Sequence, residues 1–198
     1  MADLFHVVGR QRACREFRPD PVEDDLVERC LEAATHAPSA ENRQPWVFVV
    51  VRDPELRAMV GDLTRRAWRG GGRQHSEPRL ASGLLTDVDR GAEGGVAAAP
   101  VLVVVCGDTR LGLEVTLPAS IFPAVQNLLL AATALGLGSA LTTLPVTFGA
   151  ELRTALTLPS TVQPLAVVPL GWPARRLGPP RRSPVSEKAH RDRYGAGW

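Results

Sequence analysis

Apolar side chains recur at helical spacing over residues 26–34, and this period predicts the first long helix of the chain. Acidic residues at 23–25 come directly before it, where negative charge is favoured by the helix dipole. Pro38 keeps the residues before it out of the helical region, so this helix is expected to end there. A second helix is predicted over 54–63, because Pro54 suits a first helical position and apolar residues follow at the same period.

Three short runs consist almost wholly of apolar, mainly β-branched residues, which is typical of strands that are buried on both faces. They are Trp46–Val51, Val101–Cys106 and Ala166–Gly171. Strands that alternate with helices predict an α+β or mixed α/β fold, in which helices flank a central sheet. The length of 198 residues suits a single domain over 1–198 with a sizeable core.

The segment 115–150 carries no charged side chain, and its first half predicts a buried helix. This helix is expected to begin at Pro118 or Pro123 and to run to Leu135. Prolines, glycines and amide side chains interrupt the segment too often for a membrane span, which needs about 20 consecutive apolar residues. Because apolar residues surround the helix, we expect it to be covered by the sheet and by a second subunit.

Gly136 and Gly138 follow this helix and are compatible with either a helix end or a dinucleotide-binding turn. A dinucleotide-binding turn needs a strand before the glycines and a helix after them. The chain has the opposite order, so we interpret the glycines as a carboxy-terminal cap with one residue in the left-handed conformation. A further helix is expected over 148–156.

Two segments have little regular pattern. Glycines interleaved with charged residues between Trp68 and Ala99 predict a long loop over 70–97, and such loops are usually either disordered or lids over a site. Residues 174–198 are basic and rich in proline, which predicts an arm that forms no helix or, alternatively, a frayed terminus.

Composition and charge are those of an ordinary globular protein, with 44% hydrophobic residues, 22% charged residues and a net charge of +2. So small a charge argues against general nucleic-acid binding. The three cysteines show no C-x-x-C spacing and the four histidines are scattered, so no metal site is expected. The amino terminus lacks the pattern of a signal peptide, and we expect a reducing, cytoplasmic location.

Arg12 and Arg15 lie in the phrase Arg-Ala-Cys-Arg-Glu-Phe, residues 12–17. Guanidinium groups are planar and permanently charged, and they bind the oxygens of a phosphate monoester through paired hydrogen bonds. Two of them can hold a dianion. Arginine pairs also occur on exposed helix faces and turns, so a phosphate site needs support from a second motif.

The second motif is Ala-Pro-Ser-Ala-Glu-Asn-Arg-Gln-Pro-Trp, residues 37–46. Pro38 and Pro45 disfavour helical backbone before them, so we expect an extended turn whose amide groups are free for a ligand. An ordinary connection between a helix and a strand is the alternative. We expect this turn and the arginines to meet at one flat, phosphorylated ligand, and the combination indicates a flavin mononucleotide (FMN) site.

These phrases and the later Gly-Leu-Gly-Ser, residues 136–139, resemble the FMN-dependent nitroreductase family in order and separation. The resemblance covers Phe5 to Pro184. It implies a central mixed sheet flanked by helices in an intertwined homodimer, with FMN at the subunit interface and the carboxy-terminal arm reaching across the partner. Ala13 replaces a serine of many relatives and Gln11 a basic residue, so we expect one phosphate hydrogen bond to be missing.

The resemblance also implies how FMN is held. Arg12 and Arg15, with Arg182, would bind the phosphate, and the proline turn would pack against the ring. The backbone N–H of Thr143 would donate to flavin N5. The implied cofactor-binding residues are Arg12, Ala13, Arg15, Pro38, Ser39, Asn42, Thr142, Thr143, Leu144, Arg181 and Arg182. No side chain is expected to act as an acid, base or nucleophile, because the flavin carries the chemistry.

The implied activity is ping-pong hydride transfer from NADH or NADPH, through FMN, to a small electron-poor acceptor such as a nitroaromatic compound or a quinone. Two alternatives stay open. Relatives with the same fold carry out oxygen-dependent breakdown of flavin or reductive dehalogenation. A flavin-binding protein without turnover is the other alternative. The sequence names neither the acceptor nor the preferred nicotinamide.

Overall fold

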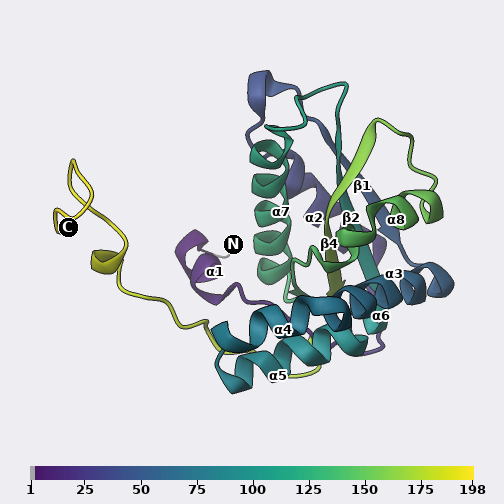
Figure 1. The fold of residues 1–198 in the computed structure, drawn as a ribbon, viewed down its shortest axis with the longest axis horizontal. Helices are drawn as coiled ribbons and strands as arrows, with labels where there is room; N and C mark the ends of the chain where they lie inside the picture. Colours follow the sequence, from purple (N-terminus) through teal and green to yellow (C-terminus); the bar gives the residue numbers. More distant parts are fainter. Residues whose placement is uncertain (1–2) are drawn as a thin grey trace.

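The computed structural model describes residues 3–198 and has a four-stranded sheet at its centre (Figure 1). The strands lie in the order β1-β2-β4-β3, with bounds β1 (Trp46–Val51), β2 (Val101–Asp108), β3 (Gly138–Ser139) and β4 (Val162–Gly171). All three neighbouring pairs are antiparallel. A mixed sheet also contains parallel pairing. In the described residues the parallel pairing is limited to one isolated bridge between Ala13 and Ser139. The three predicted strands are confirmed, and β3 adds a short fourth one.

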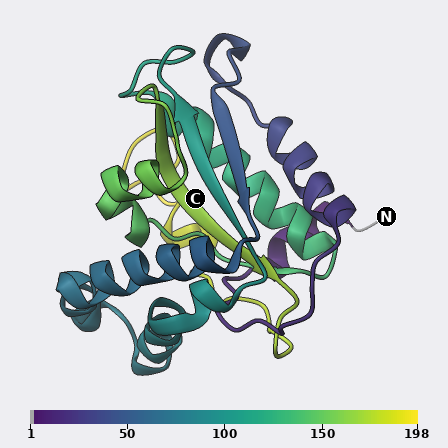
Figure 2. The same ribbon diagram turned by 90° about the vertical axis from the view of Figure 1, so that its right-hand side faces the viewer.

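Helices cover both faces of the sheet, as Figure 2 shows. One face packs against α2 (Asp24–Thr35) and α7 (Leu117–Ala134), and the other packs against α3 (Pro54–Ala67) and α8 (Gly149–Ala155). Successive residues of β2 point to opposite faces, so they divide between the two halves of the core. Val101, Val103 and Val105 belong to the first half, and Leu102, Val104 and Cys106 to the second. The expected α+β fold is confirmed.

Local signals set the start of α3 and the end of α7 close to where the sequence predicts them, although α3 continues to Ala67, beyond the predicted 54–63. The Asp53 side chain accepts a hydrogen bond of 2.8 Å from the Leu56 N–H and caps α3, whose first residue is Pro54. Just after the carboxy-terminal end of α7, Gly136 has φ +81°, and the Leu137 N–H donates to the Ala132 carbonyl at 2.8 Å. The predicted left-handed glycine cap is confirmed at Gly136.

Only one side of α7 is buried within the chain. Its inward residues pack under the sheet, whereas Phe122 on the opposite side is 37% exposed. By length and a mean hydropathy of 1.3, α7 is the one helix in the described part of the chain that could span a membrane. Its buried face packs in the first half of the core, as the buried faces of soluble core helices do.

The glycine-rich segment is helical, and the expectation of a long loop is wrong. It contains α4 (Arg73–Ser76), α5 (Ser82–Arg90) and α6 (Val96–Ala98), joined by π-type turns at Trp68–Gly72 and Gly91–Gly95 and a 3-10 turn at Glu77–Arg79. Trp68, Leu85 and Ala92 form a small core of their own, against which Leu144 packs. We call residues 68–98 the helical cap. Its apolar positions are widely spaced among glycines, which conceals the helical period.

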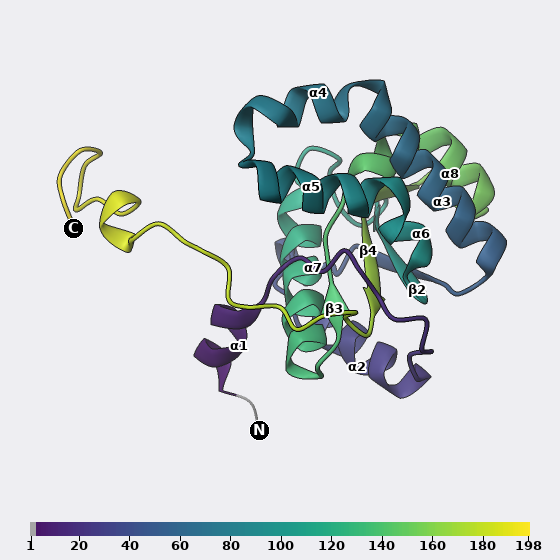
Figure 3. The same ribbon diagram turned by 90° about the horizontal axis from the view of Figure 1, so that it is seen from below.

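The carboxy-terminal arm leaves the body of the fold, whereas the first helix, α1 (Leu4–Arg10), lies beside α7 (Figure 3). Helix α1 is capped by Asp3, whose side chain accepts a hydrogen bond from the His6 N–H. Its apolar residue Phe5 is 83% exposed. Residues 174–198 form an extended arm that contains one short 3-10 turn, Val185–Glu187.

Cys30 and Cys106 are fully buried free thiols, one in each half of the core. Burial disfavours the thiolate and raises the pKa of Cys30 to about 11 and that of Cys106 to about 12. In the unfolded chain a thiol ionises near pH 9, so above this pH the unfolded state loses protons that the folded state keeps. We expect the free energy of unfolding to fall by about 1.4 kcal/mol per pH unit for each thiol between about pH 9 and 11.

Urea unfolding at about pH 8, 9 and 10 measures this slope. The Cys106→Ala variant is less stable throughout because it leaves a cavity, but its stability should decline less steeply with pH. A variant that declines as steeply as the parent protein would show that Cys106 does not cause the loss.

Candidate functional site

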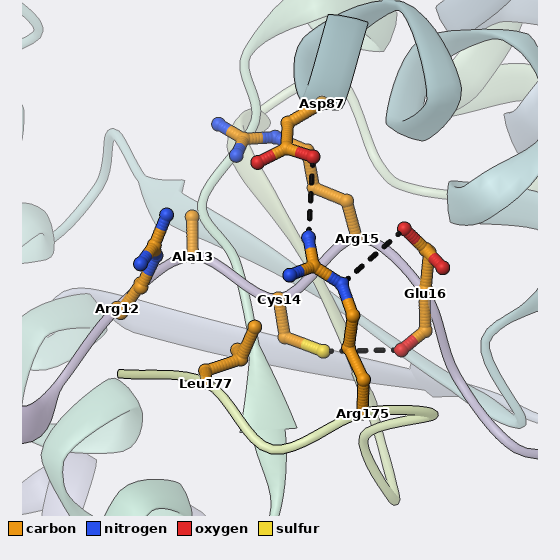
Figure 4. A pocket seen from close by; sticks show the side chains of 8 residues that line it. All are labelled: Arg12, Ala13, Cys14, Arg15, Glu16, Asp87, Arg175 and Leu177. Atoms are coloured by element: carbon orange, nitrogen blue, oxygen red, sulfur yellow. Dashed lines mark hydrogen bonds and ion pairs between the residues drawn. The ribbon is translucent and has the colours of Figure 1, made fainter. Parts of the chain in front are cut away.

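The arginine phrase, residues 12–17, runs through the molecule as an extended segment held by backbone hydrogen bonds. The Cys14 N–H donates to the Ser139 carbonyl at 2.8 Å, and the Arg18 N–H, just beyond the phrase, donates to the Trp172 carbonyl at 2.8 Å. These bonds place the phrase between β3 and the root of the arm. Figure 4 shows the side chains that gather around it.

Several hollows are lined by residues of this phrase, and two of them bear on the predicted flavin site. The larger is an open groove of about 700 Å³, which we call the basic groove; its lining includes Arg12, Ala13, Arg15, Leu141, Arg181 and Arg182. The smaller is an inner cavity of about 120 Å³ beneath the helical cap; its lining includes Arg15, Thr142, Leu144 and, from the cap, Val88, Ala92 and Val96. The structure therefore brings together most of the residues that the sequence assigns to a flavin site.

Positive charge is left uncompensated in the basic groove. Among residues 3–198, no side chain forms a hydrogen bond or ion pair with the guanidinium of Arg12 or Arg15. Burial lowers the pKa of Arg15, and repulsion from Arg12 lowers it further, while Asp87 acts in the opposite direction. A half-buried guanidinium without a partner is costly, so this groove favours an anionic ligand.

The neighbouring thiol does not offer nucleophilic chemistry. Cys14 is buried, its Sγ donates to the Glu16 carbonyl at 3.2 Å, and burial raises its pKa. A thiol with a raised pKa remains protonated near neutral pH and reacts slowly. Within residues 3–198 there is also no group of three or more His, Cys, Asp or Glu side chains that could hold a metal ion.

The backbone at Thr143 has a free donor. The Thr142 N–H donates to the Val167 carbonyl at 2.9 Å, and the Leu144 N–H donates to the Thr142 hydroxyl at 3.3 Å. The Thr143 N–H donates to no acceptor in the described part of the chain. This free N–H lies between two residues that line the inner cavity, Thr142 and Leu144, and can serve a ligand atom.

The proline turn lies elsewhere, and the expectation that it meets the arginines is wrong for a single chain. It lies at the amino-terminal end of α7, where the Ala40 N–H donates to the buried Ser120 hydroxyl at 3.2 Å. Arg12 lies near the other end, beside Thr133 and Gly136. Ser120 and Thr133 are 13 positions apart in sequence, which is about 20 Å along a helix. Pro38, Ser39 and Asn42 line none of the hollows at the arginine phrase.

The turn is also not extended, and its amide groups are not all free. Glu41, Asn42 and Gln44 have φ of 53°, 55° and 50°, in the left-handed region. The Asn42 N–H donates to the Ser39 carbonyl at 3.1 Å, and the Gln44 N–H donates to the Ser39 hydroxyl at 3.0 Å. Prolines exclude helical backbone before them, but the side chain of Ser39 stabilises a tight turn that the proline rule does not foresee.

Sequence reasoning did not identify the acidic residues at the site. Arg175, at the root of the arm, donates to Asp87 of α5 at 3.2 Å, and its Nε lies 3.7 Å from Glu16 Oε1. Arg90 pairs with the same two carboxylates. Most of these partners are more than 70 positions apart in sequence, so no local pattern marks them.

Comparison with known proteins identifies the family of this chain. The family model described as "Nitroreductase family" matches residues 8–172. An NADH dehydrogenase of Thermus thermophilus is 33% identical over 195 residues, covering 89% of each chain. A 5,6-dimethylbenzimidazole synthase of Rhodospirillum rubrum is 34% identical over 180 residues, covering 82% of this chain and 78% of that protein.

A solved structure of an iodotyrosine deiodinase bound to FMN and 3-iodo-L-tyrosine has the same fold. Its TM-score is 0.75 at 24% identity, over 92% of this chain and 96% of that chain. The resemblance found in the sequence motifs is confirmed by the match of the family model over most of the chain. The chain belongs to the nitroreductase family.

Proposed function

We propose that this protein is an FMN-dependent NAD(P)H oxidoreductase that reduces nitroaromatic compounds, quinones or similar electron-poor acceptors. The observation that carries the proposal is the pair of unpartnered guanidinium groups in the basic groove. A phosphate monoester is a dianion that matches such a pair in charge and geometry. The Thermus relative named NADH dehydrogenase supports a nicotinamide donor.

The residues present fit FMN in both size and chemistry. The groove volume of about 700 Å³ lies within the range of sites for organic ligands. Arg12, Arg15 and Arg182 would bind the phosphate, with Arg181 beside them. Ala140 and Leu141 offer an apolar wall to a ring system. The bound flavin supplies hydride acceptance and donation, in the two half-reactions of a ping-pong cycle.

The free N–H of Thr143 would donate to N5 at the reactive edge of the ring. A fixed N–H donor stabilises negative charge without any change in its own protonation state. Thr142 and Leu144 hold this donor in place, the first through its bonds to Val167 and Leu144 and the second through packing against the helical cap. No acidic or basic side chain is required in this arrangement.

A second copy of the chain would complete the site. The proline turn lies too far from Arg12 to reach the same ligand within one chain. Its exposed position and strained left-handed residues fit a turn that contacts a ligand in the partner, and strained backbone is frequent at such sites. Pro38, Ser39 and Asn42 would then pack against the flavin of the other subunit, while the exposed apolar sides of α1 and α7 would be covered.

Anaerobic spectroscopy tests the proposal. We expect the purified protein to be yellow, or to become so with added FMN, and its flavin bands to bleach when NADH or NADPH is added without oxygen. Addition of a nitroaromatic compound or a quinone should restore the bands. A protein that binds no added FMN contradicts the proposal, and a protein that keeps its colour with both nicotinamides is a flavin-binding protein without turnover.

Breakdown of the flavin itself is the second candidate. It is favoured by the 34% identity to the 5,6-dimethylbenzimidazole synthase. In that case reduced flavin in air should be consumed, and its products should accumulate on chromatography. Full return of the oxidised flavin bands in air excludes this candidate. Dehalogenation is tested in the anaerobic assay described above, with an iodinated tyrosine added in place of the quinone to reoxidise the reduced flavin.

A further inference from the structure

The helical cap rests directly on the arginine phrase. A Cβ atom built at Gly91 would lie 2.7 Å from Arg15 Cδ, and one built at Gly95 would overlap the Arg15 carbonyl oxygen. Only glycine permits so close an approach at these two positions. The cap and Arg15 are therefore in van der Waals contact along one edge of the cap.

Ion pairs form a second contact between the same edge of the cap and the arginine phrase. Arg175 lies between the cap and the phrase, with its Nη2 3.2 Å from Asp87 and its Nε 3.7 Å from Glu16 (Figure 4). Arg90 also pairs with both carboxylates. A single exposed ion pair contributes little to stability. Here each carboxylate is shared by two arginines, and the side chains of Asp87 and Glu16 are only 24% and 33% exposed.

The cap closes over the inner cavity. Val88, Ala92 and Val96 of the cap form one wall, and Thr142 and Leu144 lie on the other side. The cavity measures about 120 Å³, whereas sites for organic ligands usually span about 300–1,000 Å³. An aromatic acceptor that approaches Thr143 from this side therefore needs the cap to move away.

We propose that Arg175 is a positioning residue that holds the helical cap closed over the inner cavity through Asp87 and Glu16. Release of this contact lets the cap move and admits bulky acceptors. Because Arg175 lies at the root of the arm, the placement of the arm and the closure of the cap are coupled. The statement about acceptors rests on the proposed function, whereas the closure of the cap does not.

Hydrogen exchange of the FMN-free protein tests the closure without any assay of activity. In Arg175→Gln we expect the amides of residues 82–98 to exchange about fivefold faster than in the parent protein, because these helices open more often. Arg176→Gln is the matched control, since Arg176 is the next residue, is exposed and forms no ion pair among residues 3–198. Equal exchange in the two variants overturns the proposal.

A double-variant cycle separates the contact with Asp87 from a general effect of the substitution. Arg175→Gln should speed the exchange less in an Asp87→Asn background than in the parent protein, since the contact is already absent there. If Arg175→Gln speeds the exchange by the same factor in both backgrounds, the contact with Asp87 does not hold the cap.

Kinetics of the FMN-loaded protein test the consequence. For Arg175→Gln we expect kcat/KM for a naphthoquinone to rise about threefold relative to that for benzoquinone, with no such change in Arg176→Gln. An unchanged ratio together with faster exchange would show that the cap does not control access. If the protein takes up no FMN, the proposed function fails, and the exchange experiment still decides whether Arg175 holds the cap.

Discussion

The Arg15→Gln variant is expected to bind FMN about ten- to a hundredfold more weakly than the parent protein. A hydrogen bond between charged groups contributes about 1.5–3 kcal/mol, and each 1.4 kcal/mol corresponds to about tenfold in the dissociation constant. Glutamine keeps the Cβ, Cγ and Cδ atoms that pack against Gly91 and removes the charge. Arg15→Ala would remove the packing atoms as well as the charge, so it would weaken the contact between the helical cap and the arginine phrase as well as the phosphate site.

Titration of the flavin-free protein with FMN, followed by flavin fluorescence, gives the dissociation constant, and thermal unfolding of the same protein gives its stability. Arg10→Gln is the control, because Arg10 is close in sequence, is exposed and does not line the basic groove. A fall in thermal stability of Arg15→Gln without any change in FMN binding would make Arg15 a residue of the fold alone. Equal weakening in Arg10→Gln would point to a general effect of positive charge.

The Gly95→Ala variant is expected to lose about 2–3 kcal/mol of stability. Its new methyl group would overlap the Arg15 carbonyl oxygen, and that oxygen belongs to backbone that β3 and the arm hold in place. The cap or the arginine phrase must shift, and such overpacking costs about 1–3 kcal/mol or more. Displacement of the phrase should also weaken FMN binding.

The neighbouring Gly94→Ala is a matched control. A Cβ atom at Gly94 meets nothing within 4 Å, so alanine there should be neutral or should stabilise the protein by up to about 1 kcal/mol. Chemical unfolding of both variants measures the difference. If the two substitutions have the same effect, the close contact between the cap and Arg15 does not exist in solution.

The sequence predicts the frame of this fold well because the signals for it are local. Helix α2, the strands β1 and β2 and the Gly136 cap each follow from periodicity, composition or a single glycine within a few residues. Local signals do not predict the helices of the helical cap. Its helices are short, its two π-type turns contain six glycines, and its order depends on Trp68, whose Nε1–H donates to Asp89 at 2.8 Å.

The sequence predicts which residues belong to the candidate site but not how all of them are arranged in space. In the structure Arg15 lines one cavity with Thr142 and Leu144 and a second one with Arg12. The motifs fail for the proline turn, whose shape depends on the Ser120 hydroxyl about 80 positions away and on the position of α7 between the two motifs. The ion pairs of Arg175 are missed for the same reason, since contacts between distant segments leave no trace in local sequence.

The separation of the two motifs along α7 has a consequence for handling the protein. If each flavin is held by arginines of one chain and by the proline turn of another, subunit association and cofactor uptake are linked equilibria. With free flavin held constant, dilution of the protein then still releases flavin, and excess flavin drives the chains together. Loss of colour on a size-exclusion run in flavin-containing buffer, at the elution volume of a single chain, would accordingly report dissociation of subunits rather than weak phosphate binding by the arginines.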